Sequence, residues 1–190
     1  TDMSMDDYVS IINAPTRNKP FRKTYTVEFL GNVKGGKEIH YMNLEIEKLK
    51  ELALAQIQEG EPVWFGCDVG QMSDRDQGIM DTDLYNYEEV LDTDLTFSKG
   101  ERLEYGESVL THAMVFTGVN VDEDRPLRWK VQNSWGEDPG KKGFFIMSED
   151  WFDEFNYEVV INKKYLSQEL LEIYKQEPVV LKPWDPMGSL

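Results

Sequence analysis

Two residues of the chain could do chemistry together if a predicted hairpin brings them side by side. His112, one of only two histidines, begins an alternating apolar run, and Asn133 ends the next such run. The polar segment 122–126 (DEDRP) between the runs predicts the turn. Folding about this turn places His112 opposite Asn133, and it also predicts the pairs 114–131, 116–129 and 118–127.

Burial specifies the register of this predicted hairpin. The returning run has apolar residues on one face, which are Leu127, Trp129 and Val131. Its other face is polar and is expected to meet water, with Arg128, Lys130 and Gln132. A slip of one residue would turn every side chain of a strand to the other face and separate His112 from Asn133.

A histidine beside an asparagine at a hairpin end can act as an oriented base. Directly opposed residues on one face have Cβ atoms roughly 4.5–5.5 Å apart, which is within reach of a side-chain hydrogen bond. The bond from Asn133 would fix the tautomer of His112 and aim its second ring nitrogen outward. A thiol or hydroxyl nucleophile needs such a base. The alternative is a structural polar pair at a strand end, which is also common.

The residues after His112 carry a resemblance to a known family. An apolar strand followed by Asn133–Gly136 (NSWG) resembles the second half of the papain-like Cys-His-Asn site. Three flanking segments resemble the bleomycin hydrolase and aminopeptidase C family, above all its bacterial branch: 7–15 (DYVSIINAP), 60–70 (GEPVWFGCDVG) and 182–187 (KPWDPM). The resemblance spans the chain but only the C-terminal part of the longer family polypeptide.

This resemblance implies a fold and a function. The fold would be α+β and papain-like, namely the barrel-like antiparallel sheet lobe with flanking helices. His112 and Asn133 would be catalytic, and Trp135 would cover their hydrogen bond. The full-length enzyme would be a cytoplasmic cysteine aminopeptidase that hydrolyses peptides, needs no cofactor or metal, and forms a homohexamer.

The nucleophile of such a site is missing from this sequence. Cys67 is the only cysteine, and it lies much nearer to His112 than the roughly 130–150 residues of the simplest members. Its apolar strand and the neighbouring Asp68 disfavour a thiolate, so we predict a structural cysteine. We therefore expect a C-terminal portion, without an initial Met, that lacks the half carrying the nucleophile and is inactive alone. The alternative is a non-catalytic relic of the fold that binds peptide or a partner.

Composition narrows the possible functions further. The 190 residues are 40% hydrophobic, which is enough for a core. A formal charge of −16 argues against a nucleic-acid partner, because the surface repels phosphates. One cysteine fits a reducing cytoplasm, and the chain has no apolar run of 18 residues for a membrane span.

The elements that would position the site can be predicted from pattern. We expect a loop-rich lead-in over 1–38, a sheet lobe with helices over 39–177, and an extended C-terminal arm over 178–190. The lead-in holds an edge strand at 24–30 and a group of basic residues, Arg17, Lys19, Arg22 and Lys23. These are expected to be solvated; the alternative is a contact surface for the missing half or for another subunit.

Within the lobe, the spacing of the apolar residues Ile46, Leu49, Ala53 and Ile57 predicts a helix over 44–59, with Asn43 as the cap at its start. Further strands are expected at 63–67, 143–147 and 157–161, and a helix begins at Ser167. A short helical turn follows Ser148, and the acidic stretch 70–102 is expected to be loop, with a short helix around 87–91.

Three prolines favour an extended arm after residue 177 (Pro178, Pro183 and Pro186). The family resemblance implies that its end lies along the cleft and meets the α-amino group of the substrate through its terminal carboxylate. The residues concerned are Met187, Gly188, Ser189 and Leu190. The alternative is a disordered tail.

Overall fold

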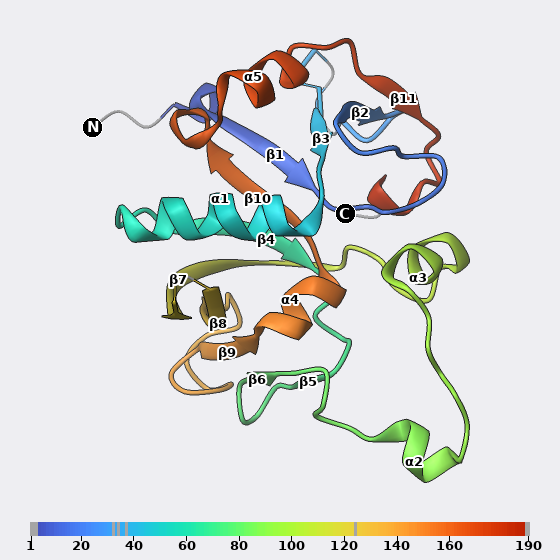
Figure 1. Ribbon diagram of the computed structural model, residues 1–190, viewed down its shortest axis with the longest axis vertical. Coiled ribbons are helices and arrows are strands. Elements are labelled where there is room, and N and C mark those ends of the chain that lie inside the picture. The colour runs from blue at the N-terminus through green and yellow to red at the C-terminus, as the bar shows by residue number, and fades with distance from the viewer. Residues whose placement is uncertain (1–3, 32, 34, 37, 124, 189–190) are drawn as a thin grey trace.

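One mixed sheet with helices packed on it makes up the molecule (Figure 1). The computed structural model describes residues 4–31, 33, 35–36, 38–123 and 125–188. The strands follow the order β11-β2-β3-β1-β10-β4-β7-β8-β9-β6-β5. Most pairs are antiparallel, and three are parallel: β1–β3, β11–β2 and β6–β9. The predicted α+β class is confirmed.

The first part of the chain contributes more to the sheet than a loop-rich lead-in would. A short 3₁₀ turn, η1 (Met5–Asp7), precedes β1 (Tyr8–Ile12), which lies inside the sheet between β3 (Tyr41–Asn43) and β10 (Asn156–Asn162). β2 (Lys23–Val27) pairs with both β3 and β11 (Val179–Leu181), so the prediction of an edge strand is wrong. β11 takes the edge instead, and its partner comes from the far end of the chain.

The predicted solvated charge cluster is also partly wrong, because Lys19 is only 2% exposed. Its ammonium meets the carboxylate of Asp185, a residue that is remote in sequence. Arg22 behaves as predicted and lies at the surface beside Glu45 and Glu169.

The longest helix, α1 (Ile46–Gln58), packs against β10, β4 (Val63–Cys67) and β7 (His112–Asp122). Its apolar face is the predicted one, but its N-cap is Glu45 and not Asn43. Asn43 is fully buried in β3, where its amide bonds both backbone groups of Ala14. An Asn beside a helix start resembles a cap in sequence, so pattern alone cannot separate the two roles.

The remaining elements are divided between the β7–β9 half of the sheet and the end of the chain. They are β5 (Ser73–Asp74), β6 (Ile79–Met80), α2 (Tyr87–Leu91), α3 (Lys99–Tyr105), β8 (Arg125–Gln132), β9 (Phe144–Ser148), α4 (Glu149–Phe155), η2 (Lys163–Tyr165), α5 (Gln168–Tyr174) and η3 (Pro186–Gly188). The helix at 87–91, the strand β9 and the caps Ser148 and Ser167 are confirmed. The helix α3 was not predicted, although Ser98 and Glu101 form a capping box at its start.

The C-terminal arm is not extended throughout. After β11 it turns, and η3 closes a 3₁₀ turn at Pro186–Gly188. Met187 is fully buried in a second core cluster, together with Leu110, Tyr41 and Leu181. Ser189 and Leu190 lie outside the described residues. None of the described helices is long and apolar enough to cross a membrane.

Candidate active site

The hairpin β7–β8 positions His112 and Asn133, but in a register that alternation did not predict. Phe116 pairs with Val131 and not with Trp129. The difference begins at the turn, where the pairs Asp122–Arg125 and Val121–Pro126 are already offset from the predicted register. The irregularities between Phe116 and Gly118, and between Asn120 and Val121, offset each other. The strands also continue into the predicted turn, since Asp122 pairs with Arg125. Leu127, which was expected to be buried, is 39% exposed.

His112 and Asn133 nevertheless meet across the end of the hairpin. Near this end the real register differs from the predicted one by an even number of residues, so both side chains stay on one face. The contact is therefore diagonal, and the two atoms His112 Nε2 and Asn133 Oδ1 are 2.9 Å apart.

A second hydrogen bond to Asn133 shows which of the two residues donates in the His112–Asn133 contact. The backbone N–H of Ser134 lies 2.7 Å from the same side-chain atom of Asn133, so that atom must be the amide oxygen. Nε2 of His112 must then carry the hydrogen and donate it. Within the described part of the chain, Nδ1 has no hydrogen-bond partner. In this tautomer Nδ1 is the ring nitrogen that carries no hydrogen and can accept one.

Trp135 lies beside this pair, where it was expected to cover the hydrogen bond. Its ring stacks on His112 with a centroid distance of 4.8 Å and an interplanar angle of 29°. The edge of Phe145 supports it from one side, and the guanidinium of Arg75 lies 5.0 Å from the Trp135 ring centroid. A ring over a hydrogen bond keeps water from competing for it.

The turn that carries Asn133 is closed by backbone contacts. The N–H of Asn133 donates to Gly143 at 3.0 Å, and Gly136 adopts a φ of 87°. At Gly143 an added Cβ would lie 2.6 Å from the carbonyl oxygen of Gly136, so a side chain cannot fit there. Arg75 accepts the N–H of Gly140, which ties this loop to the β5–β6 hairpin.

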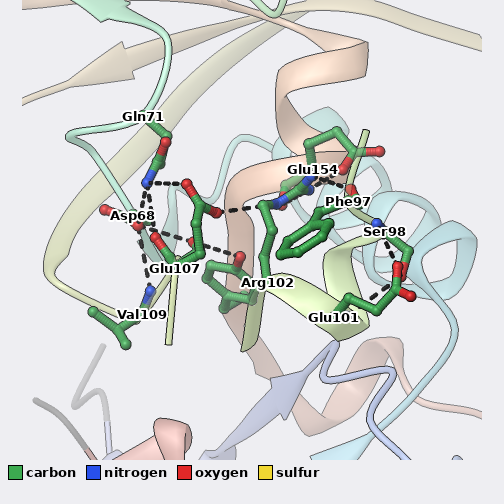
Figure 2. Close-up of polar contacts among 11 residues, drawn as sticks. Asp68, Gln71, Phe97, Ser98, Glu101, Arg102, Glu107, Val109 and Glu154 are labelled. Carbon is green, nitrogen blue, oxygen red and sulfur yellow. Dashed lines mark hydrogen bonds and ion pairs between the residues drawn. The ribbon is translucent and has the colours of Figure 1, made fainter. Parts of the chain in front are cut away.

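A buried carboxylate holds the segment that leads into His112 (Figure 2). Asp68 is 6% exposed. Its Oδ2 accepts the hydroxyl of Ser108 at 2.9 Å, the N–H of Val109 at 3.3 Å and the amide of Gln71 at 3.3 Å. Its Oδ1 accepts the hydroxyl of Thr111 at 3.2 Å. Three of these four donors belong to residues 108–111, so the buried carboxylate fixes the path of that segment.

Figure 2 also shows how this segment joins the helices. Gln71 donates to the backbone of Glu107, and Arg102 of α3 pairs with both Glu107 and Glu154. Sequence reasoning missed Asp68 and Arg75. An acid between a buried strand and a glycine was the available sign for Asp68, whereas Arg75 lies in a loop without any such sign.

Cys67 faces His112 in the β4–β7 pairing but cannot serve as its nucleophile. The residue is fully buried in the main core, and its thiol is free. Burial, and secondarily the charge of Asp68, raise the pKa of this thiol well above its usual value. A thiol that is both protonated and inaccessible is structural, in agreement with the prediction.

The C-terminal arm, up to Gly188, lines a cavity together with Val109, which belongs to the segment 108–111 that leads into His112. The cavity has a volume of about 900 Å³ and lies between the loop 16–19, α3 and the arm. Val109 and Gly188 both line it. The described residues contain no group of three or more His, Cys, Asp or Glu side chains that could hold a metal ion.

The fold is that of the papain-like class of cysteine peptidases. Residues 1–188 match the pattern of the Peptidase C1-like family, so the chain belongs to that family.

Curated relatives narrow the similarity. Over 189 residues the chain is 54% identical to aminopeptidase C of Lactococcus lactis subsp. cremoris. The match covers 99% of this chain and 43% of the relative. The chain is 47% identical over 191 residues to bleomycin hydrolase of Gallus gallus, with 98% and 42% covered.

A solved structure agrees. The crystal structure of PepW from Lactobacillus rhamnosis HN001 is 55% identical and superimposes with a TM-score of 0.97, covering 99% of this chain and 43% of that one. The chain therefore spans less than half the length of these relatives and corresponds to their C-terminal portion.

Proposed function

We propose that this chain is the C-terminal part of a cytoplasmic cysteine aminopeptidase that removes N-terminal residues from peptides. The observation that carries the proposal is the 2.9 Å contact between His112 and Asn133, which leaves Nδ1 as the basic nitrogen. It occurs in a chain that is 54% identical to an aminopeptidase C. The free cysteine supports a reducing compartment. The family resemblance further suggests a homohexamer for the full-length enzyme.

The chain would supply the base and its positioning partner, and the missing segment would supply the nucleophilic thiol. Nδ1 of His112 takes the thiol proton, which gives a thiolate and an imidazolium. The thiolate sulfur bonds to the carbonyl carbon of the substrate. As the C–N bond breaks, the imidazolium returns its proton to the leaving amine. Water then hydrolyses the thioester, with His112 again accepting a proton.

Asn133 acts through His112 in this scheme. Its amide oxygen holds the Nε2–H, so the ring cannot rotate away from the thiol. Trp135 would protect that bond from water, and its stacking on the His112 ring at 4.8 Å supports this role. Asp68 fixes the segment 108–111, and this segment sets the position of the His112 backbone from which the ring extends.

The arm from Met187 to Leu190 would set the preference for free amino termini. Support comes from Met187, which is buried in the same cluster as Leu110 of the approach to His112. An arm at this position would leave room only for the end of a peptide chain.

An activity assay tests the proposal. The purified chain alone should not hydrolyse fluorogenic amino-acid amides, because its base has no thiol to activate. The same sequence within the full-length enzyme should hydrolyse them. A non-catalytic relic would be silent in both assays, and turnover by the chain alone that is lost in His112→Ala would contradict the missing-nucleophile account.

A further inference from the structure

A buried ion pair joins the two ends of the chain. Nζ of Lys19 lies 2.7 Å from Oδ2 of Asp185, and the side chains are only 1% and 5% exposed. The side chain of Asn18 bridges them, since its amide nitrogen lies 3.4 Å from Asp185 and its oxygen 3.3 Å from the ammonium. The other ion pairs of the arm and its neighbours are exposed, as is Lys182–Glu28 at 67% and 37%.

Asp185 connects this pair to the turn at the end of the arm. While Oδ2 binds Lys19, its Oδ1 accepts the N–H of Met187 at 3.0 Å. The backbone carbonyl of Asp185 accepts the N–H of Gly188 at 2.8 Å, and its N–H donates to Lys182 at 2.9 Å. One residue thus holds three successive contacts of the turn that leads to residue 189.

The turn fits closely against the sheet. Met187 is fully buried, and a Cβ added to Gly188 would come within 2.9 Å of Cγ1 of Val27. The neighbouring Trp184 is 80% exposed and adds little burial. The position of this turn therefore depends on Asp185 and Met187.

Lys19 is itself held rigidly. Its N–H donates to Thr16 at 3.1 Å, and its carbonyl oxygen accepts from Asn43 at 2.7 Å. Asn43 is fully buried and also bonds Ala14, so the loop that carries Lys19 is fixed to the middle of the sheet. Because the backbone of Lys19 is held in this way, its ion pair with Asp185 fixes the position of the arm relative to the sheet.

A buried pair of this kind is better suited to fix geometry than to add stability. Removing two charges from water costs about as much as their attraction returns, whereas removing one partner leaves an unpaired buried charge. An arm displaced from its place would leave Asp185 and Lys19 in that state. The pair thus favours a single position of the arm.

We infer that the Lys19–Asp185 pair is a specificity device, in which both are positioning residues that hold the arm at Met187 and Gly188 beside the segment 108–111, which leads into His112. Both residues line the 900 Å³ cavity that also contains Val109 and Gly188. The inference rests on the proposed aminopeptidase function. It adds that a residue from the start of the chain determines how strictly the site requires a free amino terminus.

The test compares two substrates in the full-length enzyme, a fluorogenic amino-acid amide and its N-acetylated form. The ratio of their kcat/KM values should fall at least about tenfold in Lys19→Met. Lys182→Met is the matched control, since it removes an exposed ion pair from the same arm, and it should leave the ratio unchanged. A merely structural defect would lower both kcat/KM values together and would overturn the inference.

Two further variants separate the possible failures. Deleting Met187 to Leu190 should lower the ratio at least as far as Lys19→Met does. If the deletion lowers the ratio and Lys19→Met does not, the Lys19–Asp185 pair does not position the arm, although the arm itself sets the specificity. If neither changes the ratio, the arm's proposed role fails as well. Should Lys19→Met not fold, Lys19→Met/Asp185→Asn leaves no unpaired charge, and failure of that variant to fold would also overturn the inference.

Discussion

Replacing His112 with alanine should lower the kcat/KM of the full-length enzyme by about 10³-fold or more. General acid–base catalysis contributes about 10²–10⁴-fold, and the thiolate–imidazolium pair is lost together with it. The side chain is partly exposed at a strand start and belongs to neither core cluster, so the fold should persist.

The chain offers a matched control and an intermediate variant for this experiment. His40, the other histidine, stacks on Tyr174 at 4.4 Å, so it is held by α5 and not by the hairpin. His40→Ala should leave turnover nearly unchanged. Asn133→Ala should lower turnover by about 10²-fold or less, because the ring loses its orientation but keeps its proton chemistry. If His112→Ala keeps more than a tenth of the wild-type kcat/KM, His112 is not the base.

Replacing Phe116 with alanine should lower the free energy of unfolding by about 3–5 kcal/mol. Phe116 is fully buried on the strand that begins at His112. Its ring stacks on Phe65 at 3.8 Å and contacts Trp129 at 5.0 Å and Phe152 at 5.5 Å. The change would leave a cavity where three elements meet, and so large a loss is a substantial part of the stability of an ordinary domain.

Urea denaturation of the purified chain measures this loss, and Phe29→Ala is its control. Phe29 is 84% exposed, so its removal should change the free energy of unfolding by less than about 0.5 kcal/mol. Equal effects of the two substitutions would mean that the aromatic cluster does not hold β7 to its neighbours.

Local pattern predicted those parts of the fold that depend on local sequence. The apolar spacing of α1, the cap Ser167 and the short strand β4 all arise from neighbouring residues. The hairpin register did not follow from pattern, because alternation does not specify where the turn falls. Asp122 already pairs with Arg125 beside the turn, and the irregularities beyond Phe116 and Asn120 offset each other.

The site divides in the same way. His112 and Asn133 could be predicted because an even shift keeps them on one face. The four donors to Asp68 could not, since they come from loops that only the fold brings together. Lys19 is the extreme case, because its partner Asp185 lies at the opposite end of the chain. A basic residue in a polar loop is usually solvated, and no local rule shows otherwise.

The central claim is that this chain carries the base of the site and not its nucleophile, and covalent labelling tests it most directly. The full-length enzyme is treated with an epoxide-type peptide inhibitor, and the modified residue is located by peptide mass mapping. We expect stoichiometric modification of a cysteine outside this chain, slowed in His112→Ala, with Cys67 unmodified because it is fully buried. Modification of Cys67 that substrate prevents would contradict the account.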